Sequence, residues 1–297
     1  MKKMKRNLPL HIMLLSALIL MLIYNYLPLL GNIMAFQKFN PTKGFFRSEW
    51  VGLDNFRYVF AMPDTLQVVW NTFFIAVMKL IMGIIVPVIV ALLLNEMRCI
   101  RYKRALQTIV YFPHFLSWVI LAGIMVDVLS PSRGIIGKAF TALGLEAPFL
   151  LGDANLFPFT MVFTETWKEF GFGTIVYLAA LTGIDPTLYE AAGIDGAGRW
   201  KQTLNITIPC IMPIVMLMTI LAMGNVLNAG FDQIFNLYSP QVYATGDILD
   251  TLVYRIGMED AQYGVATAVG LFKSVVSFLM LSLSYGLAYK YTDYRVF

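Results

Sequence analysis

Long blocks of apolar residues, separated by shorter polar segments, dominate the pattern along this chain of 297 residues. A bilayer core about 30 Å thick requires about 20 mostly apolar residues in a helix that crosses it. Six blocks meet this requirement and predict spans near residues 9–34, 68–95, 106–129, 157–181, 207–229 and 263–289. The pattern therefore predicts an all-α membrane protein whose residues 1–297 form a single transmembrane domain.

The composition agrees with lipid surroundings for most of the chain. Hydrophobic residues make up 58% of the sequence and charged residues 13%, whereas an ordinary soluble domain carries about 25% charged residues. The net charge of +4 does not indicate a nucleic-acid surface, because the basic residues stand in short clusters at the edges of apolar blocks. Cys99 and Cys210 suggest neither a disulfide framework nor a metal site. We expect no metal and no nucleic-acid partner.

Lysine and arginine predict the orientation of the chain, because short cytoplasmic loops are enriched in both. With the N-terminus inside, twelve of the 22 basic residues fall in inner segments and seven in the longer outer loops. The inner residues are Lys2, Lys3, Lys5, Arg6, Arg98, Arg101, Lys103, Arg104, Arg199, Lys201, Lys290 and Arg295. We expect both termini in the cytoplasm. The first span is too long for a typical signal peptide and is interpreted as a retained anchor.

The segment 182–206 connects the fourth and fifth spans on the predicted cytoplasmic side. Its Asp185-Pro186 pair is typical of a helix start, because aspartate caps free N–H groups and proline fits the first helical position. The pattern predicts a short helix over residues 187–194, ended by a turn at Asp195-Gly196.

This short helix is a candidate coupling element. The small side chains of Ala191 and Ala192 allow another backbone to approach closely, and Glu190 and Asp195 supply polar groups beside that flat patch. If the helix docks in a groove of a soluble partner, it transmits rigid-body motion into the fourth and fifth spans. The competing interpretation is a simple connector rich in alanine and glycine.

The same segment resembles the signature of permease subunits of bacterial binding-protein-dependent ABC importers. That signature is E-A-A, three residues, G, nine residues, then I-x-L-P. It is present here as Glu190-Ala191-Ala192, Gly196, Ile206 and Ile208-Pro209, with isoleucine in place of leucine at 208. This departure keeps an apolar side chain at the entry to the fifth span.

Further segments are similar to the sugar-permease branch, of the lipoprotein-associated, polysaccharide or multiple-sugar type. They are Asn-Tyr-Leu-Pro at 25–28, Tyr-Phe-Pro at 111–113 and Glu-Thr-Trp-Lys at 165–168. The resemblance implies a type I importer fold with alternating access in the bacterial cell membrane. It also implies a second permease, two ATPase subunits and an extracytoplasmic binding protein that delivers oligosaccharide or polysaccharide fragments. No G-x-x-x-x-G-K-[ST] loop is present, so this chain is expected to be non-catalytic, with ATP and magnesium on the ATPase.

Polar residues inside predicted spans are candidates for the substrate pathway, because ionisable groups in lipid usually face a bundle interior or water. Glu165, Trp167 and Lys168 form one group, in which Lys168 is close enough along a helix to pair with Glu165. This group either lines the pathway or has a structural role. Lys79 and Asn71 are weaker candidates for contact with the substrate.

A second polar group stands at the end of the fifth span. Asn225 and Asn228 share a helical face, and they either bind sugar hydroxyls or form hydrogen bonds between helices. Asp232 and Gln233 belong to the same candidate pathway, or they lie outside and contact the binding protein.

Three other functions remain as alternatives. An intramembrane enzyme would need a convergent catalytic group, but His11 and His114 lie on different spans without a known catalytic motif. An ion-coupled secondary transporter would often show paired broken helices in related halves, which the sequence lacks. A permease of the same class for a non-sugar solute also agrees with the pattern.

Overall fold

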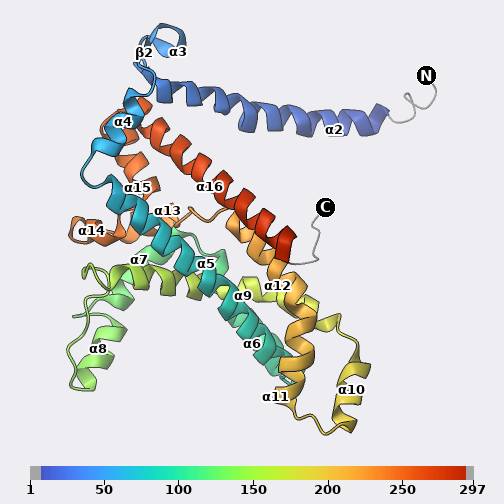
Figure 1. Ribbon diagram of the computed structural model, residues 1–297. Coiled ribbons are helices and arrows are strands. Elements are labelled where there is room, and N and C mark those ends of the chain that lie inside the picture. Colours follow the sequence, from blue (N-terminus) through green and yellow to red (C-terminus); the bar gives the residue numbers. More distant parts are fainter. Residues whose placement is uncertain (1–7, 292–297) are drawn as a thin grey trace. The chain divides into compact units, whose positions relative to one another are not determined.

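The computed structural model describes residues 8–291 and is mostly helical (Figure 1). The chain forms two compact units, one from residues 1–65 with 252–272 and the other from 66–251 with 273–297. Four basic residues near the N-terminus and one near the C-terminus, on which part of the predicted orientation depends, lie outside the described residues. They are Lys2, Lys3, Lys5, Arg6 and Arg295.

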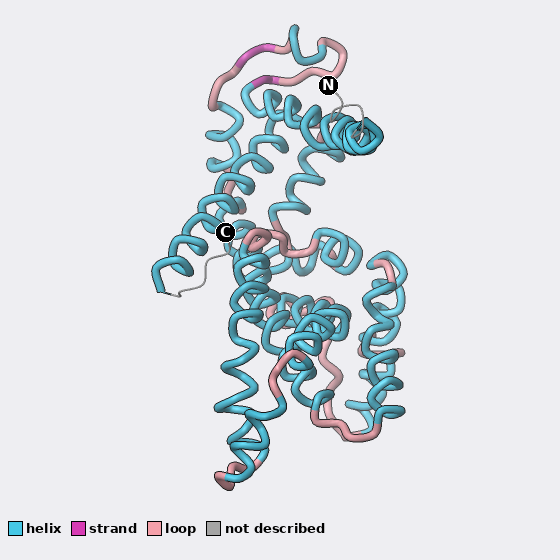
Figure 2. The backbone as a smooth tube through the Cα atoms, turned by 90° about the vertical axis from the view of Figure 1, so that its right-hand side faces the viewer, coloured by secondary structure: helices cyan, strands magenta, loops and turns pink. Residues whose placement is uncertain are grey.

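The first unit begins with a long helical segment and a small hairpin. Its elements are α2 (Leu8–Met21), the π turn η1 (Leu22–Tyr26), the 3-10 segment η2 (Leu27–Phe36), β1 (Gln37–Lys38), α3 (Gly44–Arg47), β2 (Glu49–Trp50), α4 (Asp54–Ala61), the π turn η6 (Arg255–Glu259) and the first turns of α16 (Tyr263–Tyr291). The two antiparallel strands, magenta in Figure 2, pair Gln37 with Trp50. The Asn55 amide donates to the carbonyl oxygens of Ala35 (2.8 Å) and Gln37 (3.0 Å), so α4 is fixed against the end of η2.

The second unit contains most of the remaining helices. They are α5 (Thr65–Asn95), α6 (Ile100–Tyr111), η3 (Phe112–Phe115), α7 (Trp118–Leu129), α8 (Ile135–Ala142), α9 (Phe157–Thr182), α10 (Pro186–Ile194), α11 (Arg199–Gln202), the π turn η4 (Thr203–Thr207), α12 (Ile208–Met223), α13 (Phe231–Leu237), η5 (Pro240–Val242), α14 (Tyr243–Gly246) and α15 (Leu249–Tyr254), whose last turn belongs to the first unit. Two apolar clusters form its core, one around Phe157 and Met161 and the other around Tyr177 and Ile211.

Four helical segments are long and apolar enough to cross a membrane. They are His11–Phe36, Thr65–Asn95, Arg199–Met223 and Tyr263–Leu283, and they correspond to the first, second, fifth and sixth predicted spans. The segments between the predicted spans on the predicted outer side also contain short helices, among them α4, α13, α14 and α15.

The span predicted over 106–129 is not a single straight helix. The helical segments Ile100–Phe115 and Trp118–Leu129 meet at an angle of 107°. Pro113 lies in the 3-10 turn η3, Leu116 is extended, and the Ser117 hydroxyl caps a new helix by accepting from the Ile120 N–H. Proline cannot donate to a continuing helix, and the cap favours a fresh start in another direction. Only if the bent pair counts as one crossing does it become a fifth candidate span.

The fourth and fifth predicted spans also differ from their expected form. The helix predicted over 157–181 is present as α9, but its centre carries Glu165, Lys168 and Glu169, so it is not among the four apolar candidates. The span predicted over 207–229 begins earlier and ends at Met223. Residues 224–230 form non-helical turns that end at Gly230, whose φ of +89° is a left-handed conformation suited to glycine.

Close packing of α9 on α6 depends on Gly171. A Cβ atom at this position would lie 1.9 Å from the carbonyl oxygen of Val110. We expect Gly171→Ala to destabilise the protein by about 1–3 kcal/mol, because the backbone of α6 must move. A loss of stability would be informative, because the same substitution in the open interior of a helix stabilises a protein by about 1 kcal/mol. The Tm in nanodiscs should fall for Gly171→Ala but not for Gly123→Ala, where a Cβ atom meets nothing within 4 Å; equal Tm values would contradict this packing argument.

Candidate functional site

The helix α10 is built as its local sequence predicts. The Asp185 carboxylate accepts from the Thr187 N–H at 2.9 Å, and Pro186 is the first helical residue. At the other end the Ala197 N–H donates to the Ala192 carbonyl oxygen (2.8 Å), and Gly196 has a φ of +77°. A left-handed residue after the last turn is a common helix termination, and glycine adopts it without strain. The predicted helix over 187–194 is confirmed.

Most of the surface of α10 is exposed, and among the described residues only Tyr189 makes a side-chain hydrogen bond to another segment. None of its residues is buried, and Ile194 is 89% exposed. Within the described residues, the side chains of Glu190 and Asp195 make no hydrogen bond or ion pair, and Ala191 is exposed. Figure 1 shows α10 set apart from the longer helices of its unit. An exposed apolar patch with free carboxylates beside it is typical of a protein contact.

Specific bonds connect the segment around α10 to two long helices. The Tyr189 hydroxyl lies 3.0 Å from that of Thr207, just before α12. The Gln202 amide donates to the Ala197 carbonyl oxygen at 3.1 Å, and Arg199 forms a 3.0 Å ion pair with Glu96, just after α5. These contacts connect the segment around α10 to the residues just before α12 and just after α5.

We expect Asp185→Ala to increase amide hydrogen exchange in the first turn of α10 several-fold, because the cap is lost. Hydrogen bonds from the Thr187 backbone and side chain hold the pKa of Asp185 below its ordinary value of 3.8. A lowered pKa means that the cap contributes fully above pH 3.8 and is lost only as the pH falls through the lower folded value. Exchange mass spectrometry near pH 7 should show fast exchange in Asp185→Ala and near-native exchange in Asp185→Asn, which keeps an acceptor. Native exchange in both variants would contradict the cap.

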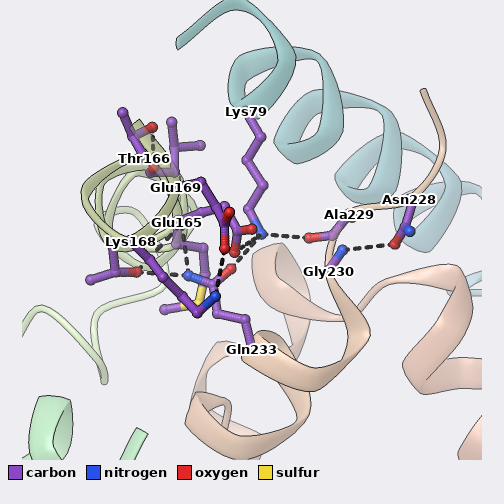
Figure 3. Close-up of polar contacts among 12 residues, drawn as sticks. Lys79, Glu165, Thr166, Lys168, Glu169, Asn228, Ala229, Gly230 and Gln233 are labelled. Carbon is purple, nitrogen blue, oxygen red and sulfur yellow. Dashed lines mark hydrogen bonds and ion pairs between the residues drawn. The ribbon is translucent and has the colours of Figure 1, made fainter. Parts of the chain in front are cut away.

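A second polar site surrounds the buried side chain of Lys79 on α5 (Figure 3). Its ammonium group donates to the Ala229 carbonyl oxygen at 2.6 Å and to the side-chain oxygen of Gln233. Glu165 on α9 lies 3.8 Å away and pairs with it electrostatically. The Lys79 side chain is 9% exposed, so this one cation joins α5, α9 and the turn before α13. Buried charges need such partners, because an unpaired charge in this position is costly.

The predicted pairing of Lys168 with Glu165 is wrong. Lys168 instead contacts the adjacent Glu169 (2.5 Å) and the His114 carbonyl oxygen (3.2 Å), while Glu165 faces Lys79. The other oxygen of Glu169 lies 2.6 Å from Nδ1 of His114, whose ring stacks on Phe172 at 4.0 Å. These contacts attach the bend between α6 and α7 to the charged centre of α9.

A cleft of about 370 Å³ lies beside these groups. Its walls come from α5, α9 and the turn before α13, and the lining residues are Lys79, Gly83, Pro87, Glu165, Thr166, Glu169, Phe170, Phe172, Gly173, Asn228 and Gly230. One oxygen of Glu165 is buried and accepts no hydrogen bond. The cleft thus combines carboxylates, an amide and aromatic rings in the middle of otherwise apolar helices.

The structure brings together some of the predicted pathway residues and separates others. Glu165 and Asn228 line the cleft, and Gln233 binds Lys79 behind it. Trp167 is 38% exposed and lies outside the cleft lining. Asn225 is exposed and stands in a non-helical turn with Asn228, so the predicted shared helical face is absent.

The possible outer position of Gln233 is also corrected. Gln233 is fully buried, with its amide donating to the Met161 carbonyl oxygen (2.9 Å) and the Thr164 hydroxyl (2.7 Å). Asp232 beside it is exposed, so of these two residues Asp232 is the one accessible to the binding protein.

Sequence reasoning gave too little weight to Lys79 and did not select His114. Glu169 was a candidate only as one of the charged residues within predicted spans. A charged residue in the middle of a long apolar segment was the available signal for Lys79 and Glu169. No signal pointed to His114, because its role depends on the bend that brings it to α9.

Comparison with known proteins identifies relatives over nearly the whole chain. The family described as "Binding-protein-dependent transport system inner membrane component" matches residues 83–295. Protein LplB of Bacillus subtilis (strain 168) is 41% identical over 95% of this chain and 88% of its own length. The polygalacturonan/rhamnogalacturonan transport system permease protein YteP of the same organism is 36% identical over 97% and 90%.

Solved structures of similar fold are also known. A chain of a bacterial ABC transporter involved in the import of the acidic polysaccharide alginate superposes with a TM-score of 0.90 at 37% identity, over 98% of both chains. A chain from a bacterial alginate ABC transporter in complex with an alginate pentasaccharide-bound periplasmic protein gives the same TM-score and identity, over 99% of both.

Proposed function

Because the chain belongs to the family of binding-protein-dependent transport system inner membrane components and is a permease subunit of a sugar or polysaccharide ABC importer, we propose that it lines half of a pathway for oligosaccharide or polysaccharide fragments. A second permease supplies the other half. Two ATPase subunits drive the cycle, and an extracytoplasmic binding protein delivers the sugar. The fold is that of a type I ABC importer permease.

The observation that carries this proposal is the largely exposed helix α10, which is linked to the residue before α12 through Tyr189 and followed by an ion pair of Arg199 with Glu96, just after α5. Its free surface contains Glu190, Ala191 and Ala192, followed by Asp195 and Gly196, in the spacing of the family signature. Small side chains allow a groove of an ATPase to approach, and the Tyr189 and Arg199 contacts pass the motion on. Such rigid-body transmission is the mechanical requirement of alternating access.

The topology that follows from this assignment is a multi-pass protein of the bacterial cytoplasmic membrane. We propose six crossings with both termini in the cytoplasm, the bent pair α6–α7 and the charged helix α9 contributing two of them. Arg98, Arg101, Lys103 and Arg104 cluster around the start of α6, which the proposed topology places on the same side of the membrane as α10. Basic clusters of this kind favour the cytoplasmic side. In an importer, α10 must face the compartment that contains ATP.

We propose that the cleft beside Lys79 belongs to the sugar pathway. Hydrogen-bonding groups and flat aromatic rings together match the hydroxyls and apolar ring faces of carbohydrates. Glu165 and Asn228 line the cleft, while Gln233 and Lys168 support it through Lys79 and Glu169. Trp167, Asn225 and Asp232 remain candidate contacts outside the cleft, Asp232 being accessible to the binding protein.

Reconstitution tests the proposal. The chain is purified with its co-expressed partners, placed in proteoliposomes, and supplied with a binding protein loaded with a galacturonate oligosaccharide outside and ATP inside. We expect uptake that requires ATP and this chain. Uptake that continues without ATP and stops when the proton gradient is dissipated would favour an ion-coupled carrier and refute the proposal.

A further inference from the structure

The first unit contains a cavity that neither α10 nor the cleft beside Lys79 uses. Its volume is about 640 Å³, within the range of ligand pockets. Three segments form its walls: residues 37–39, residues 51–58 and residues 261–265. The first segment follows the end of the candidate span His11–Phe36, and the third leads into the candidate span Tyr263–Leu283. The cavity therefore lies where these spans meet the predicted outer surface.

The lining of this outer cavity mixes aromatic rings with side-chain amides. The rings belong to Phe39, Tyr58 and Tyr263, and the amides to Gln37, Asn55 and Gln262. Phe39 and Tyr263 meet edge to face at 6.1 Å, which fixes one aromatic wall. Rings for stacking on an apolar face, with amides for hydroxyl groups, are the combination that suits carbohydrates.

One polar atom at the wall has no partner. Gln37 is 5% exposed; its amide nitrogen donates to the Phe45 carbonyl oxygen at 2.9 Å, but its amide oxygen is buried and accepts no hydrogen bond. Buried acceptors are normally satisfied, and an exception calls for a missing ligand or water. A hydroxyl group is the kind of donor that this oxygen lacks.

The backbone of the cavity is held in an unusual conformation. Ala261 has a φ of +54° and is the only non-glycine residue at positive φ among residues 8–291. Nearby, a Cβ atom at Gly264 would lie 2.4 Å from the Gln37 carbonyl oxygen and 2.9 Å from the Asn55 amide nitrogen. Strained positions persist where the surroundings force them, and they are frequent at ligand sites. The wall is therefore closely packed and preorganised rather than a loose surface hollow.

We propose that this outer cavity is a saccharide-binding site that holds part of the oligosaccharide before it enters the cleft beside Lys79. This inference rests on the proposed function and extends it to a second site. Charge plays a minor part, because Asp54 is paired with Arg57 (3.1 Å) and Lys38 is the one lining cation among the described residues. Peptide addition to the hairpin is disfavoured, since β1 offers only two residues.

Two variants test the site without disturbing buried packing. Tyr58 is 51% exposed, and Gln262 is exposed, so Tyr58→Ala and Gln262→Ala should fold. The full chain with its co-purified subunits, in nanodiscs and without binding protein, is titrated calorimetrically with a galacturonate tetrasaccharide and with a neutral xylose tetrasaccharide. We expect each variant to bind at least one of these sugars about tenfold more weakly. The matched control Phe46→Ala, a fully exposed ring of the same unit outside the cavity, should bind normally.

The outcomes separate this inference from the proposed function. Unchanged binding of both sugars in both variants would overturn the saccharide site, even with ATP-driven uptake intact. Normal sugar binding combined with weaker docking of the binding protein would also overturn it, and would assign the cavity to a protein contact. Absence of ATP-driven uptake in the unaltered complex would instead count against the proposed function.

Discussion

Ala191→Arg is expected to reduce ATP-driven sugar uptake to background while the chain remains folded in the membrane. Ala191 is exposed on α10, and no described side chain covers it. An arginine there costs the isolated chain little, because surface substitutions usually change stability by less than about 0.5 kcal/mol. In the complex, however, the long charged side chain occupies the space of an approaching backbone. Co-purification of the ATPase and uptake in proteoliposomes measure the effect.

Two further variants sharpen this prediction. Ala191→Ser keeps a small side chain and should retain uptake and ATPase binding. Gly196→Val should weaken both, since a β-branched residue resists the φ of +77° that ends α10. Normal ATPase binding in Ala191→Arg would show that α10 does not touch the motor.

Lys79→Met is expected to cause the largest loss of folding stability among the site variants, about 3 kcal/mol or more. Methionine preserves much of the side-chain volume but leaves the Ala229 carbonyl oxygen and the Gln233 amide oxygen without their donor. It also leaves Glu165 without the cation that lies 3.8 Å away. Because these three groups belong to different segments, both the stability and the cleft should suffer. Thermal unfolding in nanodiscs and membrane expression level measure the loss.

A double variant and a control complete this test. Lys79→Met with Glu165→Gln removes the unpaired carboxylate and should recover part of the stability lost by the single variant. Lys201→Met changes an exposed lysine on α11 and should have little effect. If Lys79→Met unfolds at the same temperature as Lys201→Met, the ammonium group does not hold these helices together.

The sequence predicts the helix α10, on which the first prediction depends, but not the contacts of Lys79, on which the second depends. The bounds and caps of α10 follow from Asp185, Pro186 and Gly196, whose preferences act within a few residues. Long apolar blocks are likewise a property of contiguous residues, and they predicted all four candidate spans. The charged residues at the centre of α9 stand out in the sequence of a predicted span, but the sequence does not show which residues they pair with.

The sequence by itself determined that the chain is a helical membrane protein, where most of its long helices lie, and that a capped helix with small side chains stands between two of them. The tertiary structure alone decided that α6 and α7 meet at 107°, that Glu165 pairs with Lys79 rather than Lys168, and that Gln233 is buried. The reason is physical. Turn and helix preferences depend on neighbouring residues, whereas Lys79 bonds to Ala229 and Gln233, which lie about 150 residues further along the sequence. Such contacts are set by how whole helices pack, which no local pattern encodes.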